Sequence, residues 1–381
     1  MEGGFTIQLH KINYAILIPI FLLSVISILS IYSALTYTSS SLGNLALKQG
    51  IWYGIGWILV IILIRLKNEY LYQRTWYLYC FGILSLIGLF FLTDPINGSR
   101  CWYVIPGIGS IQPSEFMKIF LMLTLATMIH NFRNDYENPN WKQELVFLLK
   151  TFGIVLIPSI LTFLQPDTGC VILYLVIYVS MIFVSGIRMR WFLLAGFLVT
   201  LFLGVSLWLY FQKETVFIQI FGSSIYYRLE RIFKWQEGSG LQLENAMTAI
   251  GSAGLLGHGY NQTPVYFPES STDFIFAVYA SNFGFIGVLL LLGIIFFFDL
   301  QIVFLSKRKI MDTDKYILSG ILGMLLFQQI QNIGMTVGLL PITGITLPFV
   351  SYGGSSLLSY MLMVGILLNI SVEKNRTYHY R

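Results

Sequence analysis

The chain has 381 residues, of which 56 % are hydrophobic and only 11 % are charged, and its formal net charge is +5. A soluble domain has roughly 45–50 % apolar and about 25 % charged residues, so this chain has too few charges to cover a water-exposed surface. The composition excludes a large soluble catalytic domain and predicts an integral membrane protein. Any chemistry must therefore lie at helix ends and in loops.

Simple patterns exclude several classes of site. The three cysteines, Cys80, Cys101 and Cys170, give neither a disulfide framework nor metal-ligand spacing, and the four histidines are too far apart for a zincin-like motif. No Gly-Lys pair occurs, so a Walker-type nucleotide site is absent. No basic stripe indicates nucleic acid. We expect no metal-ligating residues and no nucleic-acid partner.

Ten apolar windows are long enough to cross a bilayer, since a helical span needs about 20 apolar residues. They lie at residues 14–36, 49–65, 75–92, 115–131, 145–163, 168–186, 191–211, 274–305, 316–338 and 355–372. No A-x-A-like cleavage site follows the first window, which favours a retained anchor over a signal peptide. We predict an all-α polytopic membrane protein in which residues 1–381 form one domain with ten transmembrane helices.

The distribution of Lys and Arg predicts the orientation. With the N-terminus inside, the inner segments carry 15 of these residues, whereas the short outer loops carry two, Lys48 and Arg100. Because cytoplasmic loops are rich in Lys and Arg, we expect both termini to be cytoplasmic and the long loop 212–273, between the seventh and eighth spans, to be extracytoplasmic. The outer loops hold the unusual polar clusters. The working face is therefore outside, where the substrate must bring its own leaving group, as a membrane lipid pyrophosphate does.

The first polar cluster leads into the fourth span. Pro113 and Ser114 are typical of a helix start, with Ser114 as the N-cap, and Glu115 suits the first turn. Glu115 and Lys118 are three residues apart and can pair on one helix face. Lys118 lies inside the apolar window, where an ionisable group is costly, so we expect it to have a function.

Two further clusters contain carboxylates. Gln165–Gly169 forms a short outer hairpin, in which Asp167 either acts in function or simply turns the chain and caps the next helix. Glu269 and Asp273 lie at the mouth of the eighth span beside apolar residues, which raise the pKa of a carboxylate and strengthen it as a base. The alternative is that Thr272 or Asp273 only caps that span.

Two segments are rich in glycine. Ala249–Gly259 is either a backbone nest for an anion or a flexible turn. Residues 339–354 interrupt an apolar stretch with two prolines and several glycines. Irregular backbone at membrane depth survives only where it is buried in protein or lines a wet cavity. We therefore predict a re-entrant loop that forms a cavity floor.

Together these segments resemble the SEDS family (shape, elongation, division and sporulation proteins), which includes RodA, FtsW and SpoVE. The resemblance extends from the first span to the tenth. It is strongest in five ordered segments: Ile111–Lys118, Gln165–Gly169, Ala249–Gly259, Pro268–Ala277 and Gly338–Ser356. Five ordered motifs with matching topology are highly specific.

The resemblance implies a peptidoglycan glycosyltransferase that polymerises lipid II at the outer face of the bacterial cytoplasmic membrane, in elongation, division or sporulation. It also implies a class B penicillin-binding protein as the partner that crosslinks the product. Asp273 matches the family's essential aspartate and is expected to be the general base. A divalent cation, Mg²⁺ or Mn²⁺, can assist the reaction, but no ligand set in the sequence identifies its site.

The expected substrate-binding residues come from the polar clusters and from the segment that leads into the tenth span. Arg100 and Lys118, the latter oriented by Glu115, are expected to stabilise the pyrophosphate. The remaining expected contacts are Asp167, Glu269, Ser351 and Ser355.

The sequence departs from the family's pattern at five places, which indicates a divergent paralogue. They are Cys101 in place of an Arg, Asn245-Ala246 in place of Gln-Ser, Ser271 in place of a His, Ser281-Asn282 in place of an acidic pair, and Thr346-Leu347-Pro348 in place of Pro-Leu-Pro. The first departure bears on Arg100, which stands one residue before the usual position, whereas Asp273 is intact.

Two other functions remain open. A lipid II flippase explains ten helices and intramembrane charges, but it needs no carboxylate at the outer mouth, and no inverted repeat is visible. A scaffold that activates a penicillin-binding protein needs no chemistry of its own. Mutation of Asp273 separates the three hypotheses.

Overall fold

The computed structural model describes residues 13–34, 45–95, 98–105, 109–233, 240–308 and 310–372. The helices are α1 (Tyr14–Ala34), α2 (Leu45–Leu66), α3 (Asn68–Tyr72), α4 (Thr75–Leu92), α5 (Pro113–Asp135), α6 (Trp141–Leu164), α7 (Thr168–Val184), α8 (Met189–Gln212), α9 (Glu214–Phe221), α10 (Ser223–Phe233), α12 (Gly240–Ser252), α13 (Ile275–Ser306), α14 (Asp312–Thr336) and α15 (Gly354–Val372). Each predicted span overlaps one long helix.

Eight of these helices are long and apolar enough to cross a membrane, namely α1, α2, α4, α6, α8, α13, α14 and α15. The protein is therefore a multi-pass membrane protein with a largely helical fold. The other two predicted spans fall on α7, which has 17 residues, and on α5, whose buried Glu115 and Lys118 make it more polar.

Two features were not predicted from the sequence. Between α4 and α5 the chain forms an antiparallel pair of strands, β1 (Tyr103–Ile105) and β2 (Gly109–Ile111), so the fold is not purely helical. Three-residue strands are too short for periodicity to reveal them. The predicted long loop 212–273 also contains structure of its own, the helices α9, α10 and α12.

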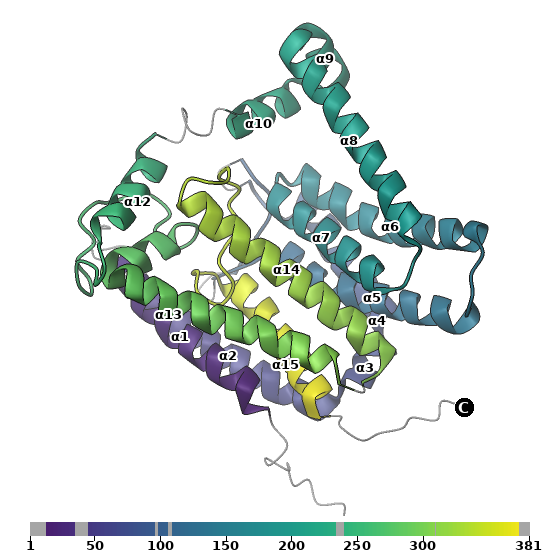
Figure 1. Cartoon of the computed structure of the whole chain (residues 1–381), viewed down its shortest axis with the longest axis horizontal. Coiled ribbons are helices and arrows are strands. Elements are labelled where there is room, and N and C mark those ends of the chain that lie inside the picture. The colour runs from purple at the N-terminus through teal and green to yellow at the C-terminus, as the bar shows by residue number, and fades with distance from the viewer. Residues whose placement is uncertain are drawn as a thin grey trace, which may run out of the picture.

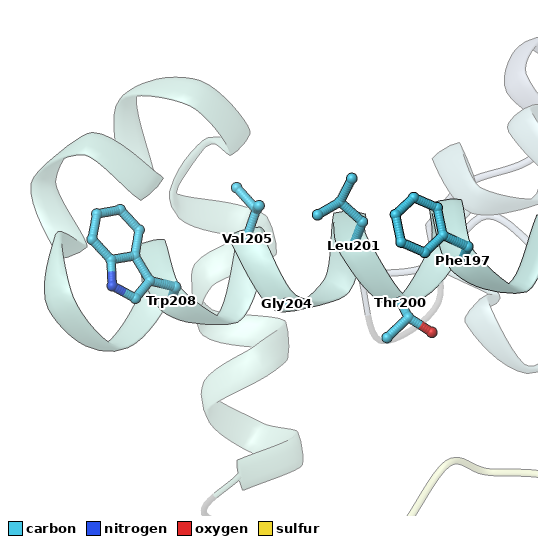
Figure 2. A pocket seen from close by; sticks show the side chains of 6 residues that line it. All are labelled: Phe197, Thr200, Leu201, Gly204, Val205 and Trp208. Atoms are coloured by element: carbon cyan, nitrogen blue, oxygen red, sulfur yellow. The ribbon is translucent and has the colours of Figure 1, made fainter.

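The bundle packs around α14 and α15. α14 contacts α7, α13 and α5, while α15 contacts α2 and α5, and Figure 1 shows α14 and α13 across the front of the bundle. α8 instead leaves the bundle and reaches α9 at the top of the view, and none of its residues is buried. A hollow of about 410 Å³ on α8 (Figure 2) is lined by apolar side chains and one threonine, without a titratable group.

α13 is broken near its N-terminal end. Gly284 has φ 61° and ψ −163°, which is far from helical geometry, so nearby backbone groups lose their helical partners. Two of these groups, the carbonyls of Ser281 and Asn282, accept hydrogen bonds from the amides of His258 and Gly259 at 2.9 and 3.2 Å. Irregular backbone inside a membrane protein needs such partners.

The glycine-dense segment also supplies acceptors to the break. The amides of Phe285 and Ile286 donate to the carbonyls of Gly254 and Leu255 at 3.0 and 3.1 Å. The segment after α12 thus satisfies the broken helix from both sides. The amides of residues 257–259 bind protein carbonyls, so the anion-nest interpretation was wrong there. Residues 253–256 form a turn.

We predict that Gly284→Ala destabilises the protein by about 1–3 kcal/mol or more. A Cβ at Gly284 would lie 2.3 Å from the Gly257 nitrogen, and the φ is in the left-handed region. The matched control is Gly293→Ala on the same helix, where an added Cβ meets nothing within 4 Å. Thermal unfolding in detergent measures the difference. Equal unfolding temperatures for the two variants would contradict the prediction.

Candidate functional site

A polar cavity of about 660 Å³ lies where segments distant in the sequence meet. Its walls come from α2, the β1–β2 hairpin, α5, α7, the turn before α13, α14 and the start of α15. Its charged lining residues are Lys48, Glu115, Asp167, Glu269 and Asp273. Ligand pockets typically measure about 300–1,000 Å³. The structure thus brings together all four carboxylates that the sequence singled out.

The non-helical segment 337–353 between α14 and α15 forms part of this cavity. Gly344, Ile345, Thr346, Tyr352 and Gly353 line it, while residues 347–350 are buried in the protein. The predicted irregular segment bordering a cavity is confirmed.

Asp273 lies in the turn before α13, partly exposed to the cavity. The N-cap of α13 is Phe274, without a side-chain cap, so the capping interpretation of Thr272 or Asp273 was wrong. Burial, and after it the nearby charge of Glu269, raise the pKa of Asp273 to about 6. Because it is not used as a cap, the carboxylate remains able to accept a proton from a ligand.

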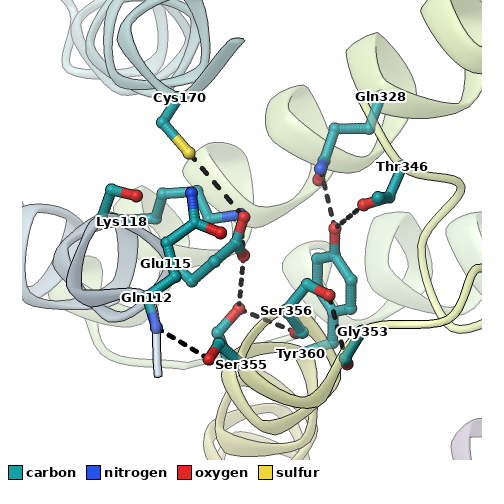
Figure 3. A network of polar contacts seen from close by, with 12 residues as sticks. Gln112, Glu115, Lys118, Cys170, Gln328, Thr346, Gly353, Ser355, Ser356 and Tyr360 are labelled. Atoms are coloured by element: carbon teal, nitrogen blue, oxygen red, sulfur yellow. Dashed lines mark hydrogen bonds and ion pairs between the residues drawn. The ribbon is translucent and has the colours of Figure 1, made fainter. Parts of the chain in front are cut away.

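Glu115 and Lys118 form the predicted ion pair. Their Oε2 and Nζ atoms are 2.6 Å apart, and the Lys118 side chain is 0 % exposed. Ser359 Oγ donates to Glu115 Oε2 at 3.4 Å, and Cys170 Sγ lies 3.7 Å from Oε1. Figure 3 shows Glu115, Lys118 and Cys170 within this network. Glu115 reaches the cavity, whereas Lys118 does not line it.

The network continues through Tyr360 of α15. Its ring centroid lies 5.3 Å from Lys118 Nζ, and its hydroxyl accepts a hydrogen bond from Gln328 Nε2 at 2.7 Å. Thr346 Oγ1 lies 3.5 Å from the same hydroxyl (Figure 3). Gln328 and Thr346 both line the cavity, so the buried cation is connected to its wall.

Asp167 has the capping role that the sequence allowed. Its Oδ1 accepts from the Cys170 amide at 3.1 Å, at the start of α7. Its Oδ2 accepts from Gln112 Nε2 at 2.8 Å and from Ser114 Oγ at 3.0 Å. Ser114 is therefore not the N-cap of α5, a position held by Gln112; its hydroxyl instead ties α5 to the α6–α7 turn.

The two serines predicted to bind substrate form hydrogen bonds with backbone groups of the protein instead. Ser351 is buried and does not line the cavity; its Oγ donates to the Thr272 carbonyl at 2.6 Å. Ser355 does line the cavity, and its Oγ accepts from the Gln112 amide at 2.9 Å and donates to the Ser110 carbonyl at 3.2 Å.

Arg100, like Lys118 and Ser351, does not line the cavity. It is exposed, and its Nη1 donates to the Phe90 carbonyl at 3.1 Å. Cys101 lines the cavity instead, with its Sγ 2.8 Å from the Gln165 carbonyl oxygen. Burial raises the pKa of the Cys101 thiol to about 12, so at neutral pH it is an uncharged donor.

Sequence reasoning missed Lys48 as a site residue. Lys48, near the start of α2, is the one cation that lines the cavity among the described residues. The sequence held no local signal for this role: Lys48 and Trp52 share one face of α2, but only the fold brings that face to the cavity.

The described residues contain no group of three or more His, Cys, Asp or Glu side chains arranged to hold a metal ion. The carboxylates of the cavity come from α5, the α6–α7 turn and the turn before α13, and only Glu269 and Asp273 share a segment. They do not fit a cation site built by the protein alone.

The comparisons with known proteins agree with this architecture. Residues 14–376 match the FtsW, RodA and SpoVE family model, described as "Cell cycle protein". The chain is 32 % identical to the "Probable peptidoglycan glycosyltransferase FtsW" of Lactococcus lactis subsp. lactis, over 96 % of this chain and 93 % of that protein. It is 33 % identical to the "Stage V sporulation protein E" of Bacillus subtilis, over 92 % and 94 %.

Solved structures share the fold. The rod shape determining protein RodA of Thermus thermophilus superposes with a TM-score of 0.68 at 24 % identity, covering 96 % of this chain and 98 % of that one. A chain of a peptidoglycan synthase complex gives a TM-score of 0.76 at 24 % identity, over 95 % and 98 %. The chain therefore belongs to the FtsW/RodA/SpoVE family of cell cycle proteins, and its fold is RodA-like.

Proposed function

We propose that this protein is a peptidoglycan glycosyltransferase that polymerises lipid II at the outer face of the bacterial cytoplasmic membrane. The observation that carries the proposal is Asp273, a carboxylate of raised pKa that faces a polar cavity. Family membership supports it, because a relative of nearly the same length is named for this activity.

We further propose that all ten long helices cross the membrane, with both termini cytoplasmic. α5 contacts α4, α7, α14 and α15, and α7 contacts α5, α6 and α14. Their polar side chains therefore meet other helices rather than lipid, so they can span at low hydropathy. The bias of Lys and Arg toward one set of loops supports an extracytoplasmic cavity.

In the proposed reaction Asp273 accepts the proton from the 4-hydroxyl of the acceptor sugar. That oxygen attacks the anomeric carbon of the donor, and undecaprenyl pyrophosphate leaves with inversion. A carboxylate with a pKa of about 6 is ionised at neutral pH and is a stronger base than an ordinary aspartate. Pyrophosphate leaves as an anion, so this scheme needs no second carboxylate as general acid, unlike glycoside hydrolysis.

The leaving pyrophosphate needs positive charge around it. We propose Lys48 as its nearest protein cation because it lines the cavity, while Lys118 acts through Glu115 from behind the wall. Arg100, exposed and bound to a carbonyl outside the lining, takes second place. A divalent cation would arrive with the pyrophosphate, whose oxygens would supply most of its ligands.

We also propose a class B penicillin-binding protein as the partner that crosslinks the product. The support is the likeness in fold to a chain from a complex that combines polymerization and crosslinking. The growth process served is elongation, division or sporulation.

We predict that Asp273→Asn abolishes polymerisation, since loss of a general base costs about 10²–10⁴-fold in rate. The assay uses purified protein in detergent with candidate class B partners, labelled lipid II and a divalent cation, and glycan strands are read on a gel. The control is Glu244→Gln, an exposed carboxylate outside the cavity lining. Substantial turnover by Asp273→Asn would reject the assignment and favour a scaffold or a flippase.

The same assay tests the pKa of the base. Turnover should rise with pH through about 6 and then level off, because only ionised Asp273 accepts a proton. Glu269→Gln removes the negative charge that helps to raise this pKa, so the midpoint should move to lower pH. An unchanged or higher midpoint in Glu269→Gln would contradict this coupling.

The ion pair predicts a pattern of stability. Lys118→Met leaves Glu115 without its cation in a buried site and should cost about 3–5 kcal/mol. The double variant Glu115→Gln/Lys118→Met removes both charges and should recover most of that loss. Thermal unfolding in detergent compares the three proteins. A double variant no more stable than Lys118→Met would show that the unpaired charge of Glu115 is not the cause of the loss.

A further inference from the structure

The turn that carries Asp273 is held through its main chain by another part of the protein. Three successive carbonyls, those of residues 271–273, each accept a hydrogen bond from the α14–α15 region. Their donors are the Tyr352 amide at 2.9 Å, Ser351 Oγ at 2.6 Å and Asn332 Nδ2 at 2.9 Å. A turn fixed at three consecutive peptide planes cannot rotate as a unit without breaking these bonds.

Asn332 differs from the other two donors because it joins two segments. Its Nδ2 donates to the carbonyl of Asp273 at 2.9 Å and to the carbonyl of Ile345 at 2.8 Å. Ile345 belongs to the cavity wall. A side-chain amide nitrogen has two hydrogens, and both are used here. Asn332 therefore fixes the distance between the turn that carries Asp273 and the part of the cavity wall at Ile345.

We propose that Asn332 is a positioning residue for polymerisation: it holds the Asp273 main chain, and through it the carboxylate, in register with the cavity wall at Ile345. The proposal rests on the proposed role of Asp273 as base. Asn332 does not line the cavity, so it acts through Asp273 rather than on substrate. A misplacement of about 1 Å at a reacting group can cost about 10²-fold in rate.

The other hydrogen-bonding atom of Asn332 argues against a purely stabilising role. Its Oδ1 is buried without a hydrogen-bond partner among the described residues. A buried acceptor without a partner is unfavourable to folding. The amide is thus retained at a cost to the fold, which is expected where geometry at a functional site takes precedence over stability.

The neighbouring residue provides a matched control. Gln331 is also a buried amide on α14, and its Nε2 donates to the carbonyl of Pro341 at 2.8 Å. Pro341 belongs to the same non-helical segment as Ile345. Gln331 therefore supports that segment without contacting the turn of Asp273. A role limited to support of the segment predicts equal effects at the two positions.

The experiment compares Asn332→Leu and Asn332→Asp with Gln331→Leu, wild type and Asp273→Asn in the polymerisation assay. Asn332→Leu has no donor, and Asn332→Asp has at most one proton to share between two carbonyls. We expect both Asn332 variants to lose about 10–100-fold in kcat, with KM for lipid II within about threefold of wild type. Gln331→Leu should keep kcat within about threefold.

Several results would overturn the proposal. These are wild-type kcat in Asn332→Leu, an equal loss in Gln331→Leu, or a loss confined to KM. Thermal unfolding checks each variant, and if Asn332→Leu does not fold, Asn332→Asp decides by the same criteria. A wild type that forms no polymer, or an active Asp273→Asn, would instead reject the proposed function, and the role of Asn332 would fall with it.

Discussion

The structure depends on one constraint: backbone groups that leave helical geometry within a membrane protein must find partners in the protein. The chain meets it by pairing irregular segments with each other. The residues after α12 bind the break in α13, and the segment 337–353 holds the turn before α13. Both pairings lie near the N-terminal end of α13. The cavity forms beside the second one, where two non-helical segments face each other.

This arrangement gives the cavity carboxylates different environments. Glu115 is neutralised by Lys118 at 2.6 Å, and Asp167 accepts three hydrogen bonds from neighbouring elements. The Asp273 side chain has neither an ion-pair partner nor a hydrogen-bond donor among the described residues, and burial raises its pKa to about 6. Glu115 and Asp167 thus hold neighbouring elements of the cavity wall together, which leaves Asp273 for the proton transfer proposed above.

Local patterns explain how much could be predicted from the sequence. Apolar windows located the long helices, the i, i+3 spacing found the Glu115–Lys118 pair, and prolines and glycines marked the segment 337–353. Roles that depend on distant contacts stayed hidden. Asn332 is one of four side-chain amides in the last part of α14, and the sequence does not distinguish it from the others because its partners lie 59 and 13 residues away. Lys48 contributed only to the orientation count, because nothing local links α2 to Asp273.

The structure shows which contacts are made by residues that depart from the family's pattern. Asn282, where an acidic residue is usual, donates to Ser33 Oγ at 2.7 Å and lies 3.2 Å from Thr263 Oγ1, so it is satisfied without a charge.

Cys101 has a larger consequence, because it leaves Lys48 as the one lining cation against four carboxylates among the described residues. A pyrophosphate adds further negative charge to such a cavity. For the reaction proposed above, these charges favour a pyrophosphate that enters with its own cation. Cys101 adds no positive charge to the wall, because burial raises the pKa of its thiol to about 12.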